Sequence, residues 1–217
     1  MSVEQPIQQV NERRAYDSTR RRERSRSAHK ALLDAALTRF LEDGYSATTI
    51  DSIAMDASVS AATIYKTYAS KAGLVRALCE RALGGTGPVP AEQRSDILQA
   101  NEPDPVKIIQ GWGRLTAEVA PRIAPLLLLL RDAAGGDPTA KSLLTELDQA
   151  RLTRMTHNAR TLVRGGHTRP GIRLADASDI LWTYSSPELY DLLVRRRHWT
   201  LRKYSAFITE AIKRALL

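Results

Sequence analysis

The sequence predicts an all-α protein, with an N-terminal three-helix domain that holds a helix-turn-helix and a second helical bundle behind it. Leu and Ala are abundant, and both residue types lose little entropy in a helix. Apolar residues recur at three- and four-residue spacing through most of the chain, which is the period of an amphipathic helix. Clusters of Gly and Pro separate these segments, and no strand pair or internal repeat interrupts the pattern.

Composition narrows the class of protein. The 217 residues are 43% hydrophobic, which supplies a core for one large or two small domains. The net charge of +8 favours a polyanionic partner, although an arginine-rich surface would give the same value. Residues 1–80 hold 12 basic and 10 acidic side chains, so the position of particular residues carries more weight than the total charge.

Several features favour the cytoplasm. The single cysteine, Cys79, excludes an intramolecular disulfide and suits a reducing compartment as a buried thiol. The first thirty residues hold no apolar run typical of a signal peptide. The longest apolar stretch, 126–130, lies between Arg122 and Arg131 and is far shorter than the roughly 20 residues that span a bilayer. We therefore expect a cytoplasmic protein with no membrane partner.

Residues 1–26 are expected to form a disordered basic arm, because they are polar and without periodicity. Its arginines are Arg20, Arg21, Arg22, Arg24 and Arg26. Such a run is either a solvated tail or, before a DNA-binding unit, a segment that reaches phosphates or a minor groove.

The next segment, 27–84, predicts four helices. The first spans about 27–42 on the apolar face of Leu33, Ala36, Leu37, Phe40 and Leu41, and Gly44 ends it. Thr49 caps a helix to about residue 56, and Ser60 caps a third helix over about 61–68 after the turn 57–60. A fourth helix begins near Lys71.

Two short helices joined by a tight turn form a helix-turn-helix. Ala54 is small enough for a close helix crossing, and Ile53, Ala57, Val59 and Ile64 are the apolar anchors. The second helix then carries donors for phosphates and base edges: Thr63, Tyr65, Lys66 and Thr67, followed by Lys71. An ordinary three-helix bundle without DNA is the alternative.

Residues 27–83 resemble the DNA-binding domain of the TetR family of transcriptional regulators. The resemblance rests on four stretches in order, 35–40, 44–50, 53–54 and 59–74. The family often has Gly at the position of Ser58 and of Ala62, Lys or Arg at that of Ala61, and Phe at that of Tyr68. The substitution at Ala61 leaves base preference more open than the fold.

The resemblance implies roles for individual residues. It places Thr49, Tyr65 and Lys71 on phosphates and Ala61, Ala62, Thr63 and Lys66 on the face that meets bases, with Ile64 and Tyr68 toward the core. The whole expected DNA-binding set is Thr49, Ser60, Ala61, Ala62, Thr63, Tyr65, Lys66, Thr67, Lys71 and the five arginines of the arm.

Residues 85–104 are expected to be a polar linker and 105–217 a ligand-binding and dimerisation domain. Its helices are predicted over about 105–120, 122–133, 138–163, 175–185, 187–196 and 199–216. Stretches 122–126, 175–182 and 186–193 resemble a common TetR-type C-terminal domain, in which the last helices form a dimer interface. The expected interface residues are Ile180, Leu181, Tyr184, Leu189, Leu192, Leu193, Phe207, Ile208 and Ile212.

A ligand pocket is expected among the helices of residues 105–165. Its apolar lining would be Trp112, Leu115, Val119, Leu126, Leu127 and Leu130, and its polar groups Thr116, Arg151, His157 and Asn158. Core packing or a solvated helix face is the alternative for each of them.

The sequence holds no catalytic constellation. Its four histidines form no pair at metal spacing, and no nucleophile elbow, P-loop or dinucleotide fingerprint occurs, so we expect neither enzyme nor cofactor nor metal. The prediction is a homodimeric repressor on a double-stranded DNA operator, released by a small-molecule effector. The alternatives are a ligand-independent DNA binder of low specificity and a helical interaction module that binds no DNA.

Overall fold

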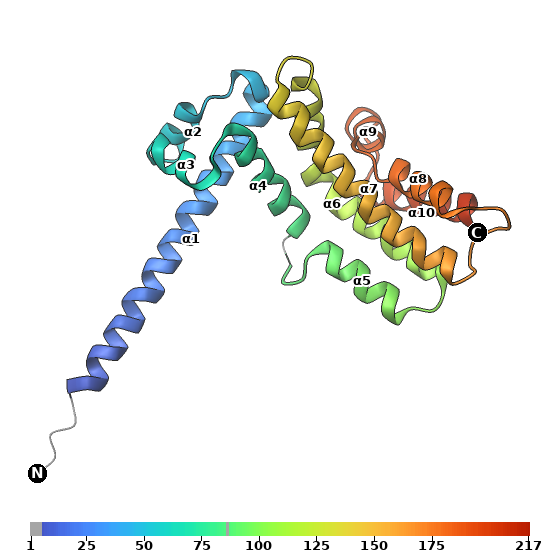
Figure 1. Ribbon diagram of the computed structural model, residues 1–217, viewed down its shortest axis with the longest axis horizontal. Coiled ribbons are helices and arrows are strands. Elements are labelled where there is room, and N and C mark those ends of the chain that lie inside the picture. Colours follow the sequence, from blue (N-terminus) through green and yellow to red (C-terminus); the bar gives the residue numbers. More distant parts are fainter. Residues whose placement is uncertain (1–5, 86) are drawn as a thin grey trace, which may run out of the picture. The chain divides into compact units, whose positions relative to one another are not determined.

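A computed structural model describes residues 6–85 and 87–217 of the chain; of residues 6–22 and 24 it describes the backbone only (Figure 1). The chain divides into two compact units, Met1–Leu74 and Val75–Leu217, and the division falls inside one helix. The described residues are helical and contain no strand, as predicted. The helices are α1 (Pro6–Ala47), α2 (Ile50–Asp56), α3 (Ala61–Tyr68), α4 (Lys71–Gly84), α5 (Ala91–Asn101), α6 (Pro105–Ala133), α7 (Pro138–Arg164), α8 (Leu174–Tyr184), α9 (Pro187–Tyr190), the π-helix η1 (Asp191–Arg196) and α10 (Leu201–Leu216).

The N-terminal unit packs α1 against α2 and α2 against α3 (Figure 1). Its buried side chains include Leu33, Phe40, Ile53 and Ile64, each at most 3% exposed. Gly44 has a φ of 81° and kinks the end of α1, as the sequence predicted. Leu41 is 49% exposed, so the predicted apolar face of α1 is narrower than expected on that side.

The expected disorder of residues 1–26 is wrong for the part that the structure describes. Helix α1 begins at Pro6 and continues through the basic run without a break before Gly44. Straight-chain Glu, Gln and Arg have good helix propensity, and they dominate this polar stretch. A helix without an apolar stripe has no periodic pattern of apolar residues. The sequence pattern therefore does not predict the part of α1 that precedes Ser27.

The C-terminal unit is a bundle of packed helices (Figure 1). Helix α6 packs against α7 and α10, α7 against α8, and α10 against α8. Their shared core includes Ile109, Leu162, Ala177, Tyr204 and Ile208, all fully buried. Aspartate caps precede a proline in the first turn of both α6 and α7: Asp104 accepts from the amide of Val106 and Asp137 from that of Thr139, each at 2.8 Å.

Two expectations for this unit need correction. The expected linker 85–104 contains α5. Its inward residues include Ala91 and Leu98, but also the polar Ser95 and Gln99, which interrupt the apolar period of the helix. The two expected helices 105–120 and 122–133 are one helix, α6, with Pro121 and Pro125 inside it. Ala120 and Ala124, each next to one of the prolines, are buried in the core. We infer that this packing stabilises the helix by more than the missing backbone hydrogen bonds at the prolines cost.

Among the described residues, no helix combines the length and the apolar character needed to cross a membrane.

Candidate nucleic-acid interface

A tight, fully bonded turn joins α2 to α3. The amide of Val59 donates to the carbonyl of Ala54 at 3.0 Å, and the amide of Ser58 donates to the carbonyl of Met55 at 3.1 Å. These two bonds are those of a Schellman motif, in which the residue after the helix end takes a positive φ. Ser58 has a φ of 53°. The geometry therefore explains why glycine would suit the position that Ser58 occupies.

Side-chain caps fix the start of both helices. Thr49 Oγ1 accepts from the amide of Ser52 at 3.0 Å, in a reciprocal capping box at the start of α2. Ser60 Oγ accepts from the amide of Thr63 at 3.2 Å at the start of α3. Thr49 and Ser60 are both exposed, so each hydroxyl both caps its helix and faces solvent. Both caps agree with the sequence prediction.

Helix α3 has one buried side chain and a broad exposed face. Ile64 is fully buried and anchors the helix, while Tyr65 is 53% exposed. Within the described part of the chain, neither the Tyr65 hydroxyl nor the Lys66 ammonium forms a hydrogen bond with another residue, and both are exposed. These two groups are free to meet phosphates or base edges.

The other polar residues of α3 are partly engaged within the helix. The Thr63 hydroxyl lies 2.8 Å from Ser60 Oγ, and the Thr67 hydroxyl donates to the carbonyl of Thr63 at 2.9 Å. Ala62 is exposed and Ala61 half-buried, so the first turn of α3 presents methyl groups. The sequence-predicted face is thus brought together on one short helix, with Tyr65 and Lys66 as its free donors.

Tyr68 differs from the expectation that it points to the core. It is half-buried, and its hydroxyl lies 3.0 Å from His29 Nδ1 of α1, with the two rings stacked at 5.8 Å. A phenol keeps its polar tip near a partner while the ring packs. The contact ties the end of α3 to α1.

Lys71 takes up a structural position that the sequence did not suggest. Its Nζ donates to the carbonyls of Tyr45 at 2.7 Å and Thr48 at 3.2 Å, and lies 4.4 Å from the centre of the Tyr45 ring. These carbonyls follow the kink at the end of α1, where backbone acceptors lack helix partners. In this structure the ammonium therefore stabilises that end of α1.

Arg39 is a further residue that sequence reasoning missed. Its guanidinium holds Asp56, the last residue of α2, through Nε at 2.5 Å and a second nitrogen at 3.0 Å. This pairing holds the pKa of the Asp56 carboxyl below its usual range. A separation of 17 residues between two partly exposed side chains leaves no local sequence signal.

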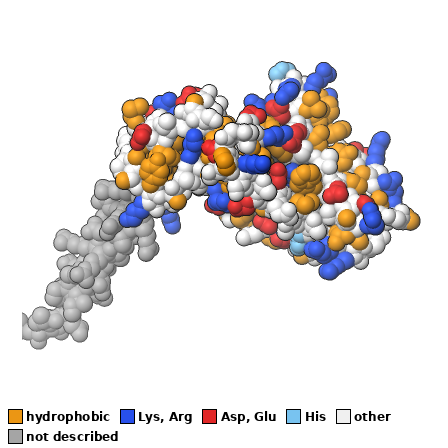
Figure 2. All heavy atoms as spheres, turned by 45° about the horizontal axis from the view of Figure 1, so that its top comes forward, with side chains coloured by type: hydrophobic (Ala, Val, Ile, Leu, Met, Phe, Trp, Pro, Cys, Tyr) orange, Lys and Arg blue, Asp and Glu red, His pale blue; other side chains and the backbone are white. Residues whose placement is uncertain are grey.

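The arginines of the arm are only partly covered by the structure. The side chains of Arg20, Arg21, Arg22 and Arg24 lie outside the described residues, and Arg26 is exposed. Figure 2 shows basic and acidic side chains interspersed over the face that it draws, without one basic field.

The residues of the predicted ligand pocket are mostly packed or engaged. Trp112 is 4% exposed, and its Nε1 donates to Ser95 Oγ at 3.1 Å. Asn158 is 5% exposed and accepts from Gln99 Nε2 at 3.2 Å. Buried in the same unit are Leu126, Leu127 and Leu130, and half-buried are Leu115, Thr116 and Val119.

Arg151 and His157, two of the polar residues predicted for the pocket, contact other groups of the protein. Arg151 donates to the carbonyl of Trp182 at 2.6 Å and to Ser185 Oγ at 3.1 Å, so it caps the end of α8. The His157 side chain is 53% exposed, and its Nε2 lies 3.2 Å from an oxygen of Asp96. The pocket remains a prediction.

The predicted dimer residues fall into two groups. Leu181, Ile208 and Ile212 are at most 3% exposed in the core of one chain, so they offer little surface to a partner, and their place in an interface stays a prediction. Leu192 is 50% and Phe207 37% exposed. Ile180, Tyr184, Leu189 and Leu193 are half-buried. Helix α10 carries apolar residues that face the core, such as Ile208, and apolar residues that face solvent, such as Phe207. Periodicity alone does not separate these two kinds of position.

Residues 32–78 match the family model described as "Bacterial regulatory proteins, tetR family". The match covers less than half of the chain, so it shows a TetR-type domain at residues 32–78. Two curated relatives from Bacillus subtilis (strain 168) match part of the chain. They are the uncharacterized HTH-type transcriptional regulators YdeS, 48% identical over 27% of this chain and 29% of its own length, and YvkB, 38% identical over 34% and 39%. The matches thus span about a third of these relatives.

Solved structures resemble this chain over nearly its whole length. NalD of Pseudomonas aeruginosa, described as the secondary repressor of the MexAB-OprM multidrug efflux pump, has a TM-score of 0.70 at 21% identity, covering 90% of this chain and 98% of that one. FadR of Bacillus subtilis, solved with stearoyl-CoA, has a TM-score of 0.69 at 16% identity, covering 87% and 100%. At such identities the likeness establishes the fold of the C-terminal unit.

Proposed function

We propose that the chain is a sequence-specific DNA-binding transcriptional regulator that acts as a homodimeric repressor and is released by a small-molecule effector. The observation that carries the proposal is the exposed face of α3, where Tyr65 and Lys66 are free donors and Ile64 anchors the helix in the core. A short helix with one buried anchor and an exposed polar face suits a recognition helix in a major groove.

The caps support a division of labour on that DNA. The hydroxyls of Thr49 and Ser60 stand at the starts of α2 and α3, where unpaired amides favour phosphate oxygens. Lys66 and Thr63 would then face base edges, and the arginines of the N-terminal arm would add charge along the backbone. Lys71 contributes through the end of α1 that it stabilises.

Dimerisation is proposed on the exposed apolar residues of the last helices. Leu192 and Phe207 are exposed, and Phe207 packs edge-on against Tyr184 and Trp199. Exposed aromatic and aliphatic side chains at the end of a chain favour a self-complementary contact. Two recognition helices would then meet two half-sites of one palindrome.

The proposed effector is a small molecule that binds the C-terminal unit. Repressor and ligand-bound neighbours share the fold, and binding of a small molecule to the C-terminal unit would shift the population of DNA-competent conformations. A regulator without an effector, which binds DNA mainly by charge, is the alternative.

Selection of binding sites from random double-stranded DNA with the full chain tests the proposal. We expect enrichment of one palindromic sequence with two equal half-sites. Recovery of unselected sequences, with binding that falls steeply with salt, would support the low-specificity alternative. No retention of DNA at physiological salt would support the interaction module.

A further inference from the structure

A groove of about 530 Å³ runs between α6 and α10 in the C-terminal unit. Helix α10 comes close to α6 at Gly113, where a Cβ atom would lie 2.1 Å from Thr209 Oγ1 and 3.0 Å from the carbonyl oxygen of Ser205. Only glycine allows this approach. None of the residues predicted for the ligand pocket lines the groove, so it is a separate feature of the surface.

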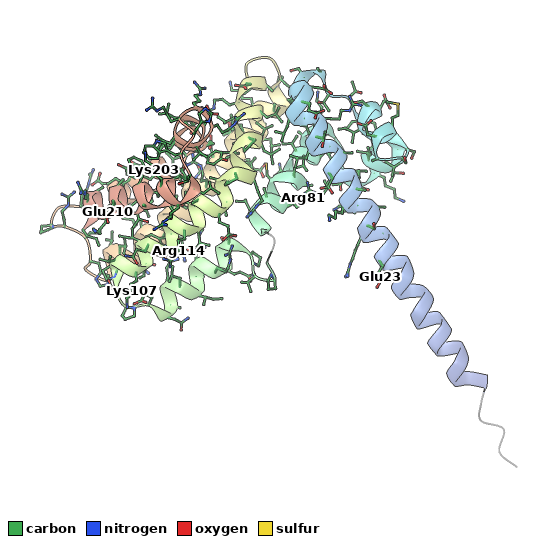
Figure 3. The ribbon with its side chains drawn as sticks, turned by 180° about the vertical axis from the view of Figure 1, so that it is seen from behind. Glu23, Arg81, Lys107, Arg114, Lys203 and Glu210 are labelled. Atoms are coloured by element: carbon green, nitrogen blue, oxygen red, sulfur yellow. The ribbon has the colours of Figure 1, made fainter. Side chains whose placement is uncertain are left out.

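Four charged side chains border the groove: Glu118 and Arg114 from α6, and Glu210 and Arg202 from α10. Figure 3 shows Arg114 and Glu210 among the side chains of these two helices. The two carboxylates are already neutralised. Arg94 binds Glu118 through two nitrogens at 2.6 and 2.9 Å, and Lys213 donates to Glu210 at 2.8 Å.

The two arginines are not neutralised. Arg114 and Arg202 are exposed, and neither forms a hydrogen bond or ion pair with another residue in the described part of the chain. The partners of Glu118 and Glu210 hold the pKa of each carboxyl below its usual range, so both acids stay charged and paired at neutral pH. The charge that the groove offers to a ligand is therefore positive.

The remaining lining is apolar or carries neutral polar groups, including the amide of Gln110. Ala117, Ala206 and Leu201 supply aliphatic surface, with Leu201 42% exposed, and Ser205 and Thr209 lie between them. A groove of this volume is within the range of small-molecule sites, which combine apolar walls with a few charged groups. Guanidinium groups bind carboxylates and phosphates through paired hydrogen bonds.

We propose that the α6–α10 groove binds an amphiphilic anion, with a carboxylate or phosphate head on Arg114 and Arg202 and an apolar portion along Leu201, Ala206 and Ala117. This inference goes beyond DNA binding and does not rest on it. A second copy of the chain that covers the groove is the competing occupant, and the experiment below separates the two.

The test is calorimetric titration of the full chain, without DNA, with decanoate, decyl phosphate, 1-decanol and inorganic phosphate. We expect decanoate or decyl phosphate, or both, to bind at least tenfold more tightly than 1-decanol and inorganic phosphate. The head group that binds identifies the source class. Equal binding of 1-decanol would overturn the role of the arginines, and equal binding of inorganic phosphate would overturn the role of the apolar wall.

Arg114→Gln and Arg202→Gln are each expected to weaken anion binding about tenfold. Arg164→Gln is the matched control, because Arg164 is exposed on α7 and outside the groove, and it should change binding less than twofold. Circular dichroism of each variant checks that the helices are retained. Unchanged binding in the folded double variant overturns the proposal.

Amide hydrogen exchange across a range of protein concentrations tests the competing occupant. If a second copy covers the groove, residues 110–118, on the α6 side that the proposed dimer contact does not use, become protected with concentration in the absence of any anion, and the proposal fails. Protection that appears on adding the anion, at constant protein concentration, supports it. DNA is absent from both experiments, so failure here leaves the proposed function untouched.

Discussion

Lys71 Nζ donates to the carbonyl oxygen of Tyr45 at 2.7 Å and lies over the ring of the same residue. The first residue of α4 thereby holds the end of α1. The sequence placed Lys71 on a DNA phosphate, because a lysine at a helix start suits an anion. The structure adds a second reason for a lysine at this position, and the two roles predict different outcomes.

Replacing Lys71 with Met removes the ammonium and leaves much of the aliphatic stem. Loss of charged hydrogen bonds to backbone carbonyls is expected to lower stability by about 1–3 kcal/mol. Thermal unfolding of the full chain, followed by circular dichroism, measures this loss. Wild-type stability together with weakened DNA binding would instead assign Lys71 to phosphate alone.

Ser58→Gly is expected to stabilise the N-terminal unit. Ser58 has a φ of 53°, which costs a side-chain-bearing residue about 1 kcal/mol and glycine almost nothing. The neighbouring Ala57 has a φ of −82°, so Ala57→Gly is the matched control and should destabilise. Urea unfolding compares the variants, and a lower midpoint for Ser58→Gly would contradict the geometry of the turn.

Gly73→Ala is expected to disrupt the corner between α3 and α4. A Cβ atom at Gly73 would lie 1.9 Å from the carbonyl oxygen of Tyr68. The backbone would have to move to relieve this clash. Such overpacking costs about 1–3 kcal/mol. Gly84, at the other end of α4, has open space around its Cβ position, so Gly84→Ala should keep wild-type stability. Equal melting temperatures for the two variants would show that the corner is looser than described.

The Arg39–Asp56 pair predicts an acid-sensitive N-terminal unit. The folded-state pKa of the Asp56 carboxyl is below its ordinary value of 3.8. The pair therefore stabilises the fold above that pH, and this stabilisation is lost as the pH falls through the lowered pKa. Asp56→Asn should therefore melt below wild type at pH 6, with the gap closing toward pH 3. A gap that is constant with pH would mean that the pair contributes through shape alone.

The sequence was most informative where caps and turns coincide with apolar anchors. Thr49 and Ser60 marked the starts of α2 and α3, and Gly44 marked the kink near the end of α1. The two hydroxyls bond to backbone amides of their own helices, and Gly44 takes a positive φ, so none of these signals depends on a distant contact. The exposed face of α3 followed directly from those boundaries.

Features set by long-range packing were not predictable in the same way. Helix α5 faces the core with Ser95 and Gln99, whose partners lie on α6 and α7, so its own sequence shows no apolar period. Leu181 and Phe207 follow the same kind of pattern, yet one is buried and the other exposed. Which side of an apolar helix meets the core is decided by its neighbours, which a single periodic segment does not contain.

We propose that the exposed face of α3 contacts the phosphates and base edges of DNA. The most direct measurement is a titration of the selected duplex at several salt concentrations with wild type, Tyr65→Phe and Lys66→Ala, using Lys107→Ala as a control that removes the same charge outside the N-terminal unit. Tyr65→Phe should weaken binding to all sequences, and Lys66→Ala should also change the selected bases. Wild-type affinity and an unchanged site for both variants would contradict the assignment of α3 as the recognition helix.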